Sequence, residues 1–322
     1  MQARILSSSE EILSALEDKA PKYIKAFYNS RLGGIILDPA FMSVPIDDHM
    51  VHRGHSVFDV IGVVEGRVIM MDRHLRRFEA SAKQARIELP MSTQDMKTAL
   101  LDLVAASKLH NAQIRCWMST GPGSLGVVPT SGMSTLYAAV TEADYMKPYG
   151  EGFKEFTVGV PLKPKFLATM KSTNYLLNAL CATESQEKGG RLGVQLDDQG
   201  YVTESCVANL AFVLPEQVLV TPPFDKILNG ITIERVMHHA QELVKEGRLS
   251  GVEQRQIHVS EAKKAVEMLQ CSADRVEGII EWDGESIGTG EVGPVTKYIQ
   301  QAMLAGNLDQ NLTELVPYQR FS

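Results

Sequence analysis

The spacing of apolar residues along the chain alternates between the period of a helix and that of a strand. Near the N-terminus, Ile12, Leu13 and Leu16 fall on one side of a short amphipathic helix. From Val57, the runs VFDVIGVV and RVIMM flank the dipeptide Glu65-Gly66. Two apolar runs around such a dipeptide predict two strands joined by a two-residue turn.

Two helices are expected next. Asp72 suits an N-cap, and the segment HLRRFEASAKQARIEL has helical spacing up to Pro90, which ends it. The apolar positions of 93–107 share one face and predict a second helix. The strand-like segments IRCWMST and LYAAVTE follow, and a loop rich in Gly and Pro separates them.

The second half of the chain is dominated by strand-like segments. They are FTVGVPL, LGVQLDD, YVTES, NLAFVL and QVLVTP. Helices are expected from about 174 to 190, from Thr232 to about 247, and over about 260–268. Strands grouped apart from helices predict an α+β fold. The aperiodic segment 146–152 separates a small N-terminal domain, 1–145, from a larger C-terminal domain, 153–322.

Composition narrows the class of protein. The chain has 322 residues, of which 44% are hydrophobic, and a net charge of -7. Two globular domains with no basic face for nucleic acid are therefore expected. No secretory signal or bilayer-length apolar stretch is visible, so we expect a soluble, cytoplasmic protein without a membrane partner. An organelle is an alternative if a transit peptide has been removed.

Several common sites are not supported. The four cysteines are scattered without a CxxC motif, which argues against a disulfide scaffold or a thiolate zinc site. The segment Gly121–Gly126 spells GxGxxG, but Pro129 follows it, so no dinucleotide-binding helix begins there. His49, His52 and His55 lack the spacing of a metal motif, and we expect no metal.

Lys171 is a candidate catalytic amine. It stands in KFLATMKSTNYLLNAL, between a strand-like stretch and the N-terminal turn of a helix. The positive end of a helix lowers an amine pKa, which suits covalent chemistry with a carbonyl. The alternative is an ordinary surface lysine.

Two further positions suit a cofactor. Glu204 follows a strand and precedes the small residues SCVAN, so it is either a solvated charge or a partner for a pyridinium nitrogen. The segment Gly230-Ile231-Thr232 begins a helix, where free N–H groups and a hydroxyl either bind phosphate or form a plain N-cap.

Six segments, in this order, resemble the class IV (fold type IV) pyridoxal-phosphate aminotransferases. They are HRGHSVFDVI, MDRHLRRFEASA, ATMKSTNYL, DDQGYVTESCVANLAFV, TPPFDKILNGIT and WDGESIGTGEVG. The segment IILDPAFMSVPIDDHMVHRGHSVFD is most similar to the plant-type D-amino acid transaminase branch. The resemblance implies a two-domain fold, pyridoxal 5′-phosphate as cofactor and a homodimer.

The resemblance also implies roles for individual residues. Lys171 matches the lysine that forms the Schiff base with the cofactor and shuttles the proton, and Glu204 matches the carboxylate that pairs with the pyridine nitrogen. The remaining matches to cofactor-binding positions are Arg77, Ile231, Thr232 and Tyr175, with Arg77, Ile231 and Thr232 on the phosphate.

Departures from the family pattern concern the phosphate and the substrate. Ala273 stands where a hydroxyl ligand of the phosphate is expected, with Ser272 just before it as a substitute. The Arg-x-His pair of bacterial D-amino acid transaminases is absent, and a substrate-side tyrosine is Phe58 here. Arg115 and Arg53 are the candidates to bind a substrate carboxylate.

The expected activity is transfer of an amino group from a D-amino acid such as D-alanine to a 2-oxo acid. Alternatives with the same fold are an (R)-selective amine transaminase, an aminodeoxychorismate lyase and a branched-chain L-amino acid aminotransferase. A non-catalytic homologue that binds pyridoxal phosphate is a further alternative, against which the joint presence of Lys171, Glu204 and Arg77 argues.

Overall fold

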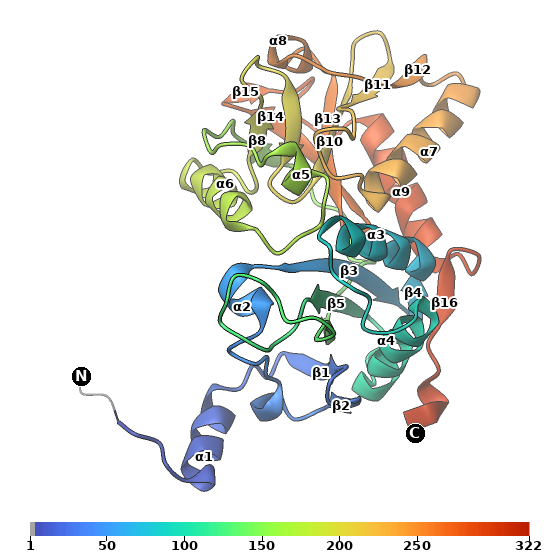
Figure 1. The fold of residues 1–322 in the computed structure, drawn as a ribbon. Coiled ribbons are helices and arrows are strands. Elements are labelled where there is room, and N and C mark those ends of the chain that lie inside the picture. Colours follow the sequence, from blue (N-terminus) through green and yellow to red (C-terminus); the bar gives the residue numbers. More distant parts are fainter. Residues whose placement is uncertain (1–3, 322) are drawn as a thin grey trace. The chain divides into compact units, whose positions relative to one another are not determined.

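The chain divides into two compact units. The structure is a computed structural model that describes residues 4–321. Unit 1 ends at Asp144 and takes in the last residues from Thr313, and unit 2 spans Tyr145–Leu312 (Figure 1). The C-terminal segment belongs to unit 1 because β16 (Thr313–Leu315) pairs with β4 (Arg67–Ile69). The sequence pattern predicted one domain over 153–322, so the pairing of the C-terminal segment with the sheet of unit 1 was not expected.

Unit 1 is built on an antiparallel seven-stranded sheet in the order β16-β4-β3-β5-β6-β1-β2. Glu65 and Gly66 join β3 to β4 and have φ values of 48° and 75°, as a tight hairpin turn requires. The predicted hairpin is therefore confirmed. Besides β4 and β16, the strands of this sheet are β1 (Ile24–Asn29), β2 (Gly34–Ile36), β3 (Ser56–Val64), β5 (Ala112–Ser119) and β6 (Thr135–Glu142).

The helices of unit 1 are α1 (Ser9–Lys19), η1 (Pro39–Phe41), α2 (His49–Arg53), α3 (Met71–Gln84), α4 (Thr93–Ser107) and η2 (Tyr318–Phe321). The N-terminal helix and the helix over 93–107 are confirmed. The predicted Asp72 N-cap is wrong, because α3 already begins at Met71, and Met70 occupies the cap without a side-chain hydrogen bond. Helices α3 and α4 pack against the sheet of unit 1.

Unit 2 contains a second, mixed sheet and a two-stranded ribbon. The sheet order is β12-β11-β10-β13-β14-β15, with β7 paired to β14, and β8 pairs with β9. The strands are β7 (Phe153–Glu155), β8 (Val194–Leu196), β9 (Val202–Ser205), β10 (Asn209–Val213), β11 (Val218–Thr221), β12 (Gly251–Gln254), β13 (Glu267–Ser272), β14 (Arg275–Trp282) and β15 (Glu285–Ser286). The helices are α5 (Lys165–Ala168), α6 (Leu176–Glu187), α7 (Ile231–Lys245), α8 (Val259–Ala262) and α9 (Pro294–Leu308).

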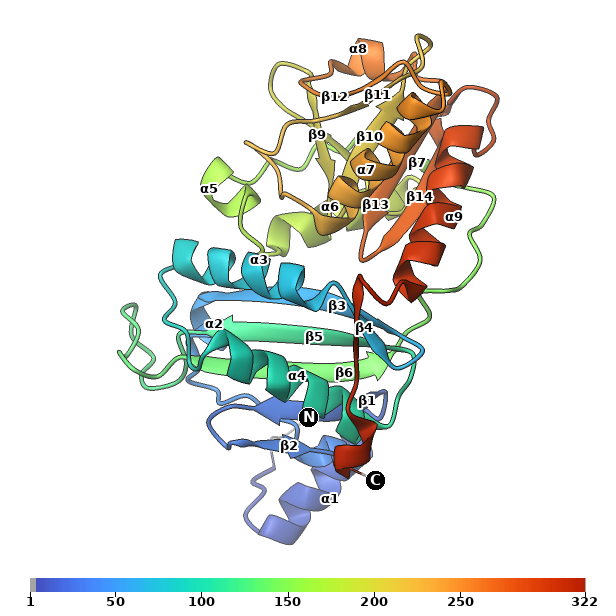
Figure 2. The same cartoon turned by 90° about the vertical axis from the view of Figure 1, so that its right-hand side faces the viewer.

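Both faces of the unit 2 sheet are covered. Alternate residues of β10 point to opposite sides, so Ala211 packs in one core cluster and Phe212 in the other. The first cluster is covered by α7 and α9, which lie side by side (Figure 2). The second contains Val202 of β9 and Ala262 of α8. The predicted α+β class is confirmed.

Three local predictions for unit 2 are wrong. The segment FTVGVPL forms only an isolated bridge, between Thr157 and Val194, instead of a strand. Side-chain carboxylates bind two of its backbone N–H groups: Thr157 N–H donates to Asp283 and Gly159 N–H to Glu184. The stretch before Lys171 forms the single helical turn α5 instead of a strand. The helix over 260–268 ends at Ala262, and Met268 lies in the buried strand β13.

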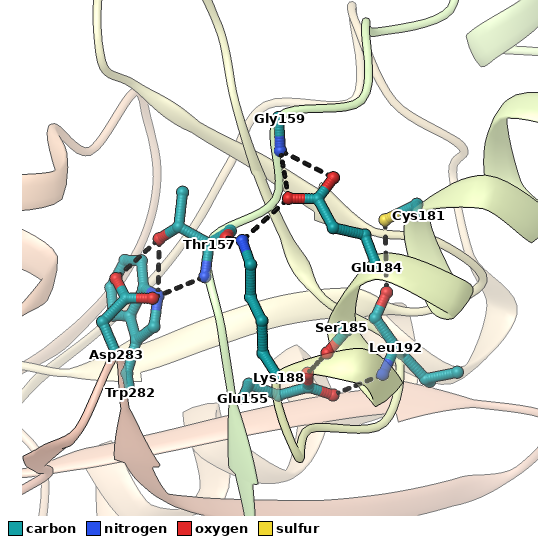
Figure 3. A network of polar contacts seen from close by, with 10 residues as sticks. All are labelled: Glu155, Thr157, Gly159, Cys181, Glu184, Ser185, Lys188, Leu192, Trp282 and Asp283. Carbon is teal, nitrogen blue, oxygen red and sulfur yellow. Dashed lines mark hydrogen bonds and ion pairs between the residues drawn. The ribbon is translucent and has the colours of Figure 1, made fainter.

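A buried carboxylate anchors the chain where unit 2 begins. Glu155, at the end of β7, is 0% exposed. It accepts hydrogen bonds from the Ser185 hydroxyl and from the Leu192 N–H, both at 2.8 Å (Figure 3). It also accepts one from the Gly193 N–H at 2.8 Å. These bonds tie β7 to the C-terminal end of α6 and to the turn that leads into β8.

We predict that Glu155→Ala destabilises unit 2 by roughly 3–5 kcal/mol, because it leaves buried N–H donors without an acceptor. The free energy of unfolding, measured by urea titration, checks this value. The exposed Glu187 of α6 provides the control, since Glu187→Ala should change it by less than about 0.5 kcal/mol. Equal effects of the two substitutions would contradict the anchoring role.

Candidate active site

Lys171 lies in unit 2, in the segment between α5 and α6. The side chain is partly buried, and its neighbours Met170 and Ser172 are 4% and 1% exposed. The sequence suggested that Lys171 lies at the N-terminal turn of a helix. That prediction is wrong, because α6 begins only at Leu176. The helix dipole falls off within a turn, so another group must supply the electrostatic environment of this amine.

That group is Glu204 on β9. Burial raises the pKa of the Glu204 carboxyl to about 7, although the nearby ammonium groups of Lys163 and Lys171 and the backbone N–H of Leu228 lower it. The structure thus brings together the two residues that the sequence singled out independently. A carboxyl group near neutrality beside an amine is typical of a site for acid–base chemistry.

Lys163 is a member of this group that the sequence analysis missed. Its Nζ lies 4.8 Å from the centroid of the Tyr175 ring, and burial lowers its pKa while Glu204 and Cys206 raise it. Val160 explains this placement, because it packs in the same small core cluster as Cys206. The signal in the sequence was a lysine within the apolar run VGVPLKPKF, which also holds a second lysine.

The loop beside Glu204 leads into an anion-binding helix start. Asn209 holds this loop, since its Nδ2 donates to the Leu228 carbonyl at 2.9 Å. A Cβ on Gly230 would lie 2.1 Å from Asn209 Oδ1, so the close approach requires glycine. Among the described residues, no side chain caps the N-terminus of α7 at Gly230. The first N–H groups, at Ile231 and Thr232, therefore suit a phosphate group.

Ser272 directly precedes a turn that contacts Thr232. It is the last residue of β13 and pairs with Arg275 across a two-residue turn. Within that turn, Asp274 N–H donates to Thr232 Oγ1 at 3.1 Å.

Arg77 lies on α3 of unit 1 and is held by a buried carboxylate. Its Nε and Nη2 donate to the two oxygens of Asp59 at 2.9 and 2.6 Å. Burial alone would raise the pKa of Asp59, but Arg77 and His74 together hold it well below its usual range. Asp59 is therefore ionised and fixes the guanidinium plane, as an anion-binding arginine requires.

Phe58 and Arg115 lie on adjacent strands of unit 1. In the pairing of β3 with β5, Phe58 is opposite Trp117 and Val60 is opposite Arg115, so all four side chains are on one face of the sheet. Arg115 is exposed. This face offers a cation between aromatic and aliphatic groups, which suits an amino acid with an apolar side chain.

Arg53 binds backbone carbonyl groups elsewhere in unit 1. Its Nη2 donates to the Leu125 carbonyl at 2.9 Å and its Nε to the Gly126 carbonyl at 3.3 Å. The GxGxxG segment accordingly forms a loop between β5 and β6, with no helix. Arg115 is thus better placed than Arg53 to bind a carboxylate.

The residues of unit 2 fit the cofactor that the resemblance implies. Pyridoxal 5′-phosphate needs an amine, a carboxylate for its ring nitrogen and a phosphate cradle. Lys171, Glu204 and the start of α7 supply these three groups. Within residues 4–321, no group of three or more His, Cys, Asp or Glu side chains could hold a metal ion. Across the same residues, no helix combines the length and the apolar character that crossing a membrane requires.

Comparison with known families and sequences agrees with this chemistry. Residues 56–280 match the family model of amino-transferase class IV. The chain is 38% identical over 299 residues to the chloroplastic D-amino-acid transaminase of Arabidopsis thaliana, covering 91% of this chain and 80% of that protein. It is 30% identical over 276 residues to the branched-chain-amino-acid aminotransferase of Escherichia coli K12, covering 80% of this chain and 86% of that protein.

The fold is that of a solved aminotransferase. The crystal structure of the branched-chain amino acid aminotransferase of Escherichia coli superposes with a TM-score of 0.81 at 25% identity. The match covers 91% of this chain and 99% of that one. The fold type IV architecture is therefore confirmed.

We predict that Glu204 gives the cofactor-free protein a distinctive pH dependence. Its folded pKa of about 7 lies above the ordinary value of 4.5. The stability it contributes is therefore fully present below pH 4.5 and is lost as the pH rises through 7. Between these limits the Tm of the wild type should fall with rising pH relative to Glu204→Gln, as scanning calorimetry can measure. Parallel Tm profiles would contradict the raised pKa.

Proposed function

Since the chain belongs to the class IV aminotransferases, which use pyridoxal 5′-phosphate, we propose that it moves the amino group of a D-amino acid such as D-alanine to a 2-oxo acid. The observation that carries the choice of donor is the similarity to the plant D-amino-acid transaminase. That similarity is 38% over 91% of the chain, against 30% over 80% for the Escherichia coli branched-chain enzyme.

The phosphate and the ring nitrogen of the cofactor are bound by separate groups in this proposal. Ile231 and Thr232 bind the phosphate at the start of α7, where no side chain of the described residues caps the helix. Arg77, fixed by two hydrogen bonds to Asp59, and Ser272 add further phosphate contacts. Glu204 accepts a hydrogen bond from the ring nitrogen and keeps it protonated. Tyr175 would contact the cofactor, as the family resemblance implies.

Lys171 is the catalytic residue. When bound, pyridoxal phosphate supplies an aldehyde that condenses with amines and a ring that accepts electrons. The Lys171 Nζ would hold the cofactor covalently, and in its free form it would be the amine nearest to the donor. The free amine then removes the proton from the donor α-carbon, acting as a general base. The Glu204 carboxylate favours this step because its charge stabilises the protonated ring nitrogen.

The substrate groups come from unit 1. Arg115 binds the donor carboxylate, and Phe58 and Trp117 flank its side chain, since these residues share one sheet face. We also propose a homodimer, which the family resemblance implies. A cytoplasmic location stays a prediction beside the organelle alternative, because the plant relative is named chloroplastic.

A branched-chain L-amino acid is the second candidate donor. Arg115 favours it, because it stands at a position similar to one where branched-chain enzymes carry a substrate-facing arginine. The similarity to branched-chain aminotransferases, which covers most of the chain, favours it as well. An (R)-amine or aminodeoxychorismate would be indicated only by turnover of an amine without a carboxylate or by release of 4-aminobenzoate.

We predict that Lys171→Ala lowers the rate by at least about a thousandfold, because the general base and the covalent attachment are both lost. After borohydride reduction of the wild type, peptide mass spectrometry should find the pyridoxyl group on Lys171. The matched control is Lys165→Ala, an exposed lysine of α5, which should react at the wild-type rate. A pyridoxyl group on Lys163 instead of Lys171 would overturn the assignment.

The donor is tested on the purified enzyme without an oxo acid. We expect D-alanine to convert the absorption band of the bound cofactor to that of pyridoxamine phosphate, and to do so at least tenfold faster than L-leucine. A faster reaction with L-leucine would assign the enzyme to branched-chain L-amino acids. A cofactor band that no amine changes would indicate a non-catalytic homologue.

A further inference from the structure

Unit 2 contains a buried ion pair next to the start of α7. Arg235 and Asp274 are 5% and 1% exposed, and Arg235 Nη1 lies 2.9 Å from Asp274 Oδ1. Arg235 also donates to Asn307 Oδ1 at 2.9 Å and to the Met303 carbonyl at 3.3 Å, both on α9. Desolvation makes such a pair a poor source of stability compared with apolar packing. Its position therefore points to a role in the site.

The ion pair holds a strained turn. Ala273 and Asp274 connect β13 to β14 with φ values of 47° and 56°. This left-handed conformation costs energy for residues other than glycine. Arg235, on α7, binds the side chain of Asp274 and thus fixes the turn against the first two turns of that helix.

The turn in its fixed position orients the Thr232 hydroxyl. Asp274 N–H donates to Thr232 Oγ1 at 3.1 Å, so this oxygen acts as an acceptor. A hydroxyl that accepts one hydrogen bond keeps its own O–H as a donor. Thr232 is the second residue of α7, a helix that begins without a side-chain cap from the described part of the chain. This leaves the O–H as a donor beside the first N–H groups of the helix.

We propose that Arg235 and Asp274 are positioning residues for the cofactor phosphate. Arg235 holds the turn, the Asp274 N–H orients the Thr232 hydroxyl, and this hydroxyl donates to a phosphate oxygen. The proposal rests on the proposed function, in which Thr232 binds the phosphate. It also explains how the site works where Ala273 replaces a hydroxyl ligand.

The test compares two ligands that differ only in the phosphate. The Kd values of pyridoxal phosphate and of pyridoxal are measured by fluorescence quenching on the full-length protein from which the cofactor has been removed. Arg235→Met should raise the Kd of pyridoxal phosphate about tenfold, which corresponds to about 1.4 kcal/mol. The Kd of pyridoxal should change less than twofold. Arg248→Met, which removes an exposed arginine, is the matched control and should change neither value.

A double substitution separates positioning from general damage. Thr232→Val should weaken the binding of pyridoxal phosphate, and adding Arg235→Met to it should then change the Kd less than twofold, because the two residues act through one hydroxyl. Equal loss for both ligands, or the full tenfold loss on top of Thr232→Val, would overturn the proposal.

Two results distinguish this inference from the proposed function. If Thr232→Val weakens pyridoxal phosphate and Arg235→Met does not, only the positioning role is wrong. If Thr232→Val leaves the Kd unchanged, the phosphate site itself is wrong and both proposals fall. If Arg235→Met does not fold, the same comparison is made with Arg235→Lys. A loss of affinity for pyridoxal phosphate alone, smaller than tenfold, then supports the positioning role. An equal loss of affinity for pyridoxal overturns it.

Discussion

Buried carboxylates can exist in this protein only where donors surround them, and much of the local structure depends on that constraint. Glu155 binds the turn before β8, Asp59 binds Arg77, and Glu267 accepts the first N–H groups of α9 at 2.9 and 2.8 Å. Each of these charges fixes a segment of backbone or a cation. Glu204 differs from them, since its partners are two ammonium groups and a backbone N–H, and its pKa is raised to about 7.

This difference separates residues that hold the structure from those that do the chemistry. Glu155 lies in the frame of unit 2, and its hydrogen bonds keep α6 and the β8–β9 ribbon in place. Glu204 lies on that ribbon and retains capacity for a further donor. In the proposed function, the ring nitrogen of the cofactor supplies such a donor and Lys171 supplies the amine. The stable frame thus allows one carboxyl of raised pKa to persist beside Lys163 and Lys171.

The sequence predicted the parts of the fold that local patterns determine. The hairpin at Glu65-Gly66 and the helix over 93–107 follow from turn chemistry and apolar spacing, and both are confirmed. It failed where distant residues take over backbone hydrogen bonds, as Glu184 and Asp283 do in the segment after β7. In the candidate site, Lys171 and Glu204 could be singled out from local context, but Lys163 could not. Its proximity to Glu204 arises from the packing of Val160 against α6 and Cys206.

The pairing of Glu204 with the cofactor is the central claim, and nitrogen NMR on bound pyridoxal phosphate labelled with ¹⁵N in the ring tests it most directly. We predict that the ring nitrogen of the wild-type enzyme carries a proton above neutral pH and that Glu204→Gln loses it. A nitrogen without a proton in the wild type, or a signal that the substitution leaves unchanged, would contradict the claim.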